Sequence, residues 1–174
     1  MSEKELNDEV ILFCREKVDL YRNNIIKRSE LPELEVRSMN LYTGSVPWWT
    51  EDRKWEWKSF KRQIDVVIGI KAEIDGEEEL IPLIVVELKS GKFLNTDELD
   101  KKSAIYGPLR EVYPWVHTVF MHRNMKERNM DEVYLLRNAR HFDTIYTEWD
   151  DRTKSLFEKL INQQLEYLLE YWKL

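Results

Sequence analysis

Apolar positions recur along the chain with two periods, which predict helices in some segments and strands in others. Apolar residues three and four apart predict an amphipathic helix over residues 4–27 and a long one from Asp151 to the end of the chain. Another helix is predicted to begin at Asn95 or Thr96, which are suitable N-cap residues, and to break near the Gly107–Pro108 pair.

Runs of isoleucine, valine and aromatic residues between turn residues predict strands. They cover residues 34–42, 62–74, 79–89, 116–122 and 143–148, and a short helix over residues 131–139 precedes the last of them. The "DGEE" stretch between the second and third strands predicts a β-hairpin. The whole order predicts a single α/β domain, residues 1–174, with a central mixed sheet flanked by helices.

A tryptophan-rich stretch follows the first strand. "TGSVPWW" (residues 43–49) is predicted to be a loop and residues 54–60 a short strand. Between Arg53 and Arg62 five basic residues stand against a single acidic one. The tryptophans of this stretch either pack in the core or at an interface, or they stack on bases while the basic side chains contact phosphates.

Two charged residues end an otherwise apolar strand. Glu87 and Lys89 follow a run that is apolar on both faces up to Val86, which is typical of a central strand. An unpaired ion inside such a strand costs on the order of several kcal/mol, so both charges should lie at the strand end, facing a cleft or a partner. The preceding strand has the same feature, because Asp65 is the only charge in "QIDVVIGI".

The register of the predicted hairpin decides whether these charges meet. A two-residue turn at Asp75–Gly76 would place Asp65 opposite Val86 and on the other face from Glu87. A three-residue loop, or a bulge, would shift the pairing by one residue and place Asp65 opposite Glu87. The sequence leaves both registers open.

Two carboxylates about 5 Å apart repel each other and call for a cation. Oxygen ligands in an open site suit Mg²⁺, and Lys89 on the same face would hold a water or stabilise negative charge on a phosphate. The alternative is a structural strand end in which Lys89 pairs with Glu87 or Asp65.

Asp65 followed by Glu87-Leu88-Lys89 on the next strand resembles the PD-(D/E)xK nuclease superfamily, which has a restriction-endonuclease-like fold. The resemblance covers roughly residues 4–123 and implies an α-β-β-β-α-β core. It also implies that Asp65, Glu87 and the main-chain carbonyl of Leu88 bind Mg²⁺, for which Mn²⁺ would substitute. Lys89 would be the catalytic lysine, and the reaction would be hydrolysis of phosphodiester bonds in DNA.

The chain departs from the family pattern at one position, because Ile64 and not proline precedes Asp65. Some members add an acidic residue from the first helix, and Glu9 is the candidate for a further metal ligand, with Glu16 nearly as good. Others use a polar residue from the helix after the lysine strand. Lys102 fits that role, with Tyr106 one turn further on.

Composition limits the choice of function. The net charge of −6 argues mildly against nucleic acid, although a local basic patch can still bind it. Cys14 is the only cysteine, which excludes disulfides and cysteine-based metal sites; we expect it to be a small buried hydrophobe. With no signal peptide or membrane span predicted, a cytoplasmic location is expected.

The sequence thus predicts a Mg²⁺-dependent DNA endonuclease. The final helix is expected to pack on the core or, as the second choice, to form a homodimer contact. The rival prediction is a non-catalytic module that binds nucleic acid or protein on an inactivated nuclease-like fold.

Overall fold

The computed structural model describes residues 2–25, 32–90, 96–124 and 137–171. Its elements are α1 (Glu3–Ile25), β1 (Leu34–Trp49), β2 (Trp55–Ile74), β3 (Glu77–Lys89), α2 (Thr96–Val112), β4 (His117–His122), β5 (Thr144–Tyr146) and α4 (Asp151–Tyr171). None of the described helices has both the length and the apolar character needed to cross a membrane.

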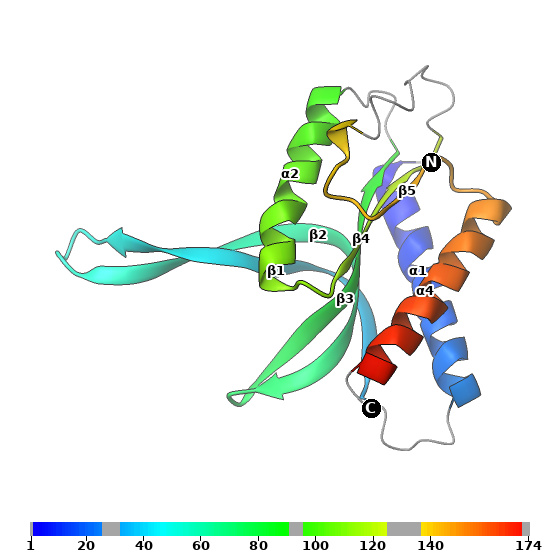
Figure 1. Ribbon diagram of the computed structural model, residues 1–174, viewed down its shortest axis with the longest axis horizontal. Helices are drawn as coiled ribbons and strands as arrows, with labels where there is room; N and C mark the ends of the chain where they lie inside the picture. Colours follow the sequence, from blue (N-terminus) through cyan, green and yellow to red (C-terminus); the bar gives the residue numbers. More distant parts are fainter. Residues whose placement is uncertain (1, 26–31, 91–95, 125–136, 172–174) are drawn as a thin grey trace.

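The strands form one mixed sheet in the order β1-β2-β3-β4-β5. The pairs β1–β2 and β2–β3 are antiparallel, and β4 and β5 run parallel to β3. Helices α1 and α4 cover one face of the sheet and α2 covers the other (Figure 1), so two apolar clusters sandwich β3. The predicted α-β-β-β-α-β core, mixed sheet and long C-terminal helix are therefore confirmed.

Packing agrees with the predicted helix faces. Cys14 is fully buried in the cluster beneath α1 and α4, as expected for a small hydrophobe, and burial raises the pKa of its thiol. Phe157, Ile161 and Leu165 of α4 lie in the same cluster. The short helix predicted over residues 131–139 falls largely outside the described residues, whereas the last strand is confirmed as β5.

The predicted loop at residues 43–49 is wrong, because these residues continue β1. The short strand predicted over residues 54–60 is not separate, because residues 55–60 belong to β2, and the two strands pair as far as Trp49 and Trp55. Two features made this stretch look like a loop. Gly44, at φ 131°, follows a bulge, and Pro47 lies on the edge strand of the sheet, where proline is tolerated.

The predicted helix break near Gly107–Pro108 is also wrong, because α2 runs through Pro108 to Val112. Tyr106 and Leu109, on either side of the proline, are fully buried, and their packing outweighs the lost helical hydrogen bond. The carbonyl that loses its donor belongs to Ala104, which lines an open cleft where water reaches it.

Candidate active site

The β2–β3 hairpin closes with a two-residue turn. Ile74 pairs with Glu77, and the turn residues Asp75–Gly76 have φ values of 54° and 82°. Two positive values in succession fit a type I′ turn, which matches the twist of the flanking strands. If this register ran on unchanged, Asp65 would lie opposite Val86.

A bulge in the middle of the hairpin changes the register. Gly69 pairs with Pro82, but Ile68 pairs with Ile84, so Leu83 is an extra residue on β3. The pairing beyond the bulge is shifted by one residue towards the strand end. The two-residue turn thus sets the register near the hairpin tip, and the bulge shifts it by one residue towards the other end of the strands.

The bulge brings the two predicted acidic residues together. Val66 pairs with Val86, so Asp65 and Glu87 are the next residues in line. The backbone N–H of Leu88 donates a hydrogen bond of 2.8 Å to the Asp65 carboxylate, which ties the two strand ends together at this point.

Gly69 makes this bulge possible. A Cβ at Gly69 would lie 2.6 Å from the carbonyl oxygen of Ile81 and 2.7 Å from Cγ of Leu80. Non-bonded atoms do not approach so closely, and one of the two is backbone, so no larger residue fits without moving β3. The glycine in the strand therefore marks a close backbone approach.

Asp65 itself lies in a second bulge. Asp65 and Val66 of β2 stand against the single residue Ser38 of β1, whose hydroxyl donates a 3.0 Å hydrogen bond to the Ile64 carbonyl. Bulges bend a strand and redirect side chains, and they are common beside active sites. The bulge at Leu83 of β3 and the bulge at Asp65–Val66 of β2 thus both affect where the Asp65 carboxylate lies.

Glu87 is buried and held by α2. Its side chain accepts a 2.7 Å hydrogen bond from the Tyr106 hydroxyl through Oε2, and the Lys102 ammonium forms an ion pair with Oε1. Burial and the Glu87 charge raise the pKa of Tyr106 well above its usual range. The structure therefore brings Lys102 and Tyr106, both singled out from the sequence, to the same carboxylate.

Asp65 carries an electrostatic penalty at neutral pH. Burial, and secondly the negative charge of Glu87, raise the pKa of Asp65 to about 6, although the Leu88 N–H and Lys102 act in the opposite direction. A nearby cation would favour the ionised form. The two carboxylates offer oxygen ligands, and a nearby positive charge would stabilise both in the ionised form. They therefore fit a hard divalent ion such as Mg²⁺.

Lys89 reaches across the strand end to α1. Its ammonium lies 3.7 Å from Oε2 of Glu3, and only 19% of its side-chain surface is exposed. The charge of Glu3 also contributes to the raised pKa of Asp65. Glu3 is thus an acidic residue of the first helix beside Lys89 and Asp65, and the sequence prediction missed it.

Glu9, the acidic residue predicted for that role, lies elsewhere. Its Oε1 accepts hydrogen bonds from Trp149 Nε1 (2.9 Å) and Lys154 Nζ (2.8 Å), and the bond from Lys154 lowers its pKa. Glu9 therefore joins α1 to the start of α4. Glu16, the second choice, contacts Lys17.

The structure thus brings together two of the predicted acidic ligands and leaves Glu9 apart from them. Across residues 2–25, 32–90, 96–124 and 137–171, no three His, Cys, Asp or Glu side chains gather closely enough to hold a metal ion by themselves. Any ion at Asp65 and Glu87 would need further ligands from the backbone, water or substrate.

Comparison with known proteins adds little to this geometry. No protein-family model and no curated protein matches the chain. One similar solved structure is the native BbvCI A2B2 tetramer at low resolution, with a TM-score of 0.48 and 10% sequence identity. The match covers 86% of this chain but 64% of the other, so the chain spans less than two-thirds of the length of that relative. A likeness of this strength supports no argument about chemistry.

Proposed function

We propose that the protein is a Mg²⁺-dependent DNA endonuclease of the PD-(D/E)xK type. The observation that carries the proposal is the meeting of Asp65 with Glu87, produced by the Leu83 bulge, in a place where burial and like charge disfavour two ionised carboxylates. A purely structural strand end gains nothing from that arrangement.

Asp65 and Glu87 are the proposed metal ligands, together with the main-chain carbonyl of Leu88. Mn²⁺ should replace Mg²⁺, because the donors are oxygens. A bound divalent ion would supply Lewis-acid polarisation of a phosphate oxygen and a more acidic water. Lys102 and Tyr106 position Glu87 through its two oxygens.

Lys89 is the proposed catalytic lysine. Its ammonium would orient the attacking water and offset the charge that develops on the phosphate. The water oxygen forms a bond to phosphorus and gives up a proton to solvent, the bond from phosphorus to one bridging oxygen breaks, and the leaving oxygen takes a proton from solvent. Glu3, 3.7 Å from the lysine, would hold the ammonium at the strand end.

Plasmid cleavage with Mg²⁺ or Mn²⁺ tests this proposal. Lys89→Ala should abolish cleavage while circular dichroism shows a folded protein. Lys71→Ala is the matched control, because Lys71 lies on the same sheet and its ion pairs are to Glu33 and Glu78, outside the candidate site. Equal cleavage by the wild type and Lys89→Ala would show that the activity comes from a contaminant or another site.

A non-catalytic binding module is the second candidate, favoured by the ion pair between Lys102 and Glu87. That pair already places a positive charge beside one of the two carboxylates. Calorimetric titration with Mn²⁺ separates the candidates: the nuclease should bind the ion and lose it in Asp65→Asn, whereas an inactivated fold should bind none.

A further inference from the structure

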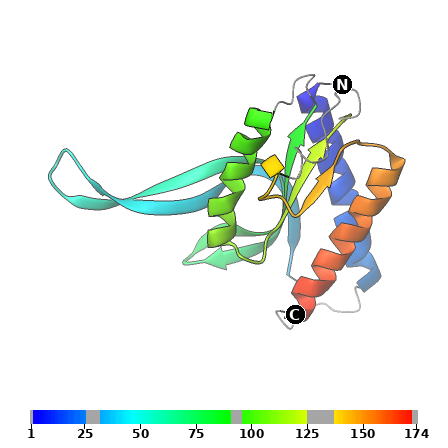
Figure 2. The same cartoon turned by 45° about the horizontal axis from the view of Figure 1, so that its top comes forward.

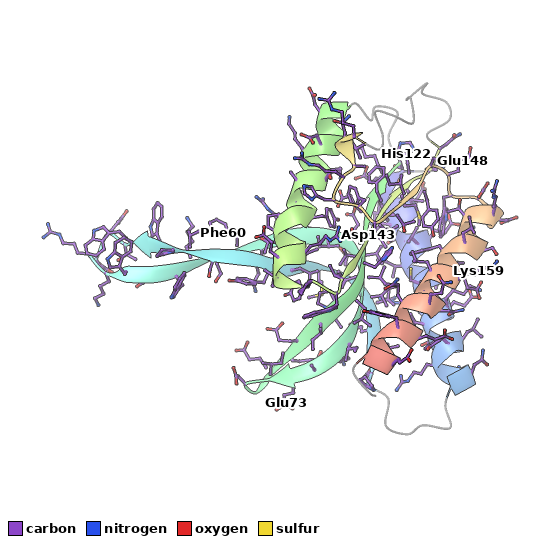
Figure 3. All side chains as sticks on the ribbon, in the orientation of Figure 1. Phe60, Glu73, His122, Asp143, Glu148 and Lys159 are labelled. Carbon is purple, nitrogen blue, oxygen red and sulfur yellow. The ribbon has the colours of Figure 1, made fainter. Side chains whose placement is uncertain are left out.

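Residues 44–60 form a two-stranded arm that projects from the body of the protein (Figures 1 and 2). Phe60 lies on this arm, away from the second hairpin tip near Glu73 (Figure 3). The tryptophans of the arm do not pack in the core, because Trp48, Trp49, Trp55 and Trp57 are 54%, 50%, 69% and 73% exposed. Large exposed apolar groups that cluster in this way mark interaction surfaces.

On one face of the arm, the strand positions next to the turn are apolar. Trp49 pairs with Trp55, and Pro47 with Trp57, two positions further on, so these four side chains share a face. The rings of Trp49 and Trp55 contact each other edge to face, with centroids 5.2 Å apart. We call these four residues the tryptophan face.

The opposite face of the arm is different. There Trp48 pairs with Glu56, and Val46 pairs with Lys58. The Lys58 ammonium lies 4.9 Å from the centroid of the Trp48 ring, so this tryptophan already has a cation over it. The tryptophan face therefore differs from the opposite face, because its tryptophans pair with apolar residues and not with charged ones.

The charge of the arm indicates the kind of partner. Residues 44–60 contain three basic and three acidic residues, and Lys61 and Arg62 follow where β2 enters the body, whereas the whole chain has a net charge of −6. Lys61 continues the alternation of Trp55 and Trp57 along β2 and is exposed at the body end of the tryptophan face. Rings flanked by cations fit a nucleic-acid strand, since its bases stack and its phosphates are anionic.

A cleft of about 370 Å³ lies where the arm meets the body. Its lining comes from the strands and from α2: Thr43, Phe60, Arg62, Lys101, Ala104, Ile105 and Pro108. Two of these residues, Arg62 and Lys101, are cations from different elements. Along β2, Arg62 alternates with Lys61, so the cleft opens on the opposite face of the strand from the tryptophan face and Lys61.

We infer that the arm binds an unpaired segment of a DNA strand, with its bases on the tryptophan face and a phosphate at Lys61. The segment must be unpaired, because the ring faces of bases inside a duplex are covered by their neighbours. This inference rests on the proposed function and narrows its substrate to DNA with a single-stranded overhang, flap or bubble.

Fluorescence anisotropy with labelled DNA, in buffer without divalent metal, tests binding apart from cleavage. Trp55→Ala/Trp57→Ala should weaken binding of a single-stranded or forked oligonucleotide about tenfold or more, and binding of blunt duplex less than about threefold. Trp48→Ala is the matched control, since it removes a tryptophan from the opposite face, and should change both affinities less than about threefold.

Three results would overturn the inference. The first is unchanged single-strand binding by the double variant, and the second is an equal loss for blunt duplex. The third is sedimentation showing a dimer that Trp55→Ala/Trp57→Ala converts to a monomer, because the tryptophan face would then cover a second copy. If the wild type binds single strands through the tryptophan face but cleaves no DNA with Mg²⁺ or Mn²⁺, the nuclease is refuted and the arm assignment stands.

Salt dependence tests the binding of phosphates separately. Each phosphate of a single strand that a side chain neutralises adds about 0.7 to the slope of log affinity against log salt. Lys61→Ala should therefore reduce that slope by about 0.7. Lys71→Ala, at the far end of β2, should leave the slope unchanged. A slope equal to that of the wild type in Lys61→Ala would exclude Lys61 as a phosphate contact, and with it the proposed path of the strand.

Discussion

The two halves of β2 differ in how deeply their residues are buried. Residues 55–63 are exposed throughout, whereas residues 64–70 are buried except for the half-buried Asp65. The inner half lies between two strands and has helices on both faces, while the outer half is paired with β1 alone. One strand thus passes from water into the core within a few residues.

This contrast shows which residues to treat as functional. In the buried half the exception is a charge, Asp65, and in the exposed half the exceptions are the apolar rings of Trp55 and Trp57. A charge in the core and a row of exposed rings both cost free energy or solubility unless a partner meets them. Under the two proposals above, the partner of the first would be a divalent cation, and the partner of the second would be the bases of a DNA strand.

The strongest test of the buried half is Glu87→Gln. Removing one carboxylate charge should reduce Mg²⁺-dependent cleavage on the order of 10³-fold, because the remaining donors hold the ion poorly. Glu56→Gln, in the outer half of β2, serves as the control in the same cleavage assay and should retain most of the activity. Comparable losses in both variants would mean that cleavage depends on negative charge anywhere on these strands, and not on the candidate site in particular.

The second test concerns the bulge. Gly69→Ala should destabilise the protein by about 1–3 kcal/mol, since a Cβ there would meet the Ile81 carbonyl oxygen at 2.6 Å. It should also lower activity, because any shift of β3 moves Glu87 relative to Asp65. Chemical denaturation measures the first effect and cleavage the second.

Ser59→Ala is the control for Gly69→Ala on the exposed half of the same strand. Its free energy of unfolding should stay within about 0.5 kcal/mol of the wild type. If Gly69→Ala folds with full stability and activity, the bulge is not what brings the two carboxylates together.

The sequence indicated which residues meet at the candidate site but left open the register that brings them together. Asp65, Glu87 and Lys89 stood out because each is a charge in or beside an apolar run, and Lys102, with Tyr106 one turn further on, followed from the resemblance to the nuclease family. The register could not be predicted, because it depends on how closely β3 approaches the backbone of its neighbour.

Other features were missed for local reasons. Glu3 is one of several acidic residues near the chain start, and only the packing of α1 against the strand end brings it to Lys89. The arm was missed because Gly44 and Pro47 resemble loop residues, although an edge strand with a bulge accommodates both. In each case the structure depends on tertiary packing, which the local sequence does not reveal.

The third test uses pH on the buried half. The folded protein protonates Asp65 below about pH 6, whereas the unfolded chain does so near 3.8. Above pH 6 both states are ionised and the folded state carries the full penalty. The penalty is relieved as the pH falls from about 6 to 3.8, because only the folded state binds the proton there.

Asp65→Asn should therefore be more stable than the wild type at pH 7.5 without metal. The gain should be about 1–2 kcal/mol, less than the full shift implies, because the carboxylate is partly screened by solvent. The difference should vanish below pH 4, and Mg²⁺ should stabilise the wild type alone. Thermal unfolding measured with and without Mg²⁺ at several pH values checks the sign, and a less stable variant at pH 7.5 would contradict it.

The smallest expected effect belongs to the outer half. Trp57→Ala should change the free energy of unfolding by no more than about 0.5 kcal/mol, because the ring is 73% exposed and its removal leaves no cavity. Val66→Ala, in the buried half of the same strand, should cost about 1–3 kcal/mol by leaving a cavity between helix and sheet. If denaturation gave similar losses for both, the tryptophans would serve stability. If Trp57→Ala leaves the free energy of unfolding unchanged but weakens single-strand binding, the role of the ring is contact with a partner.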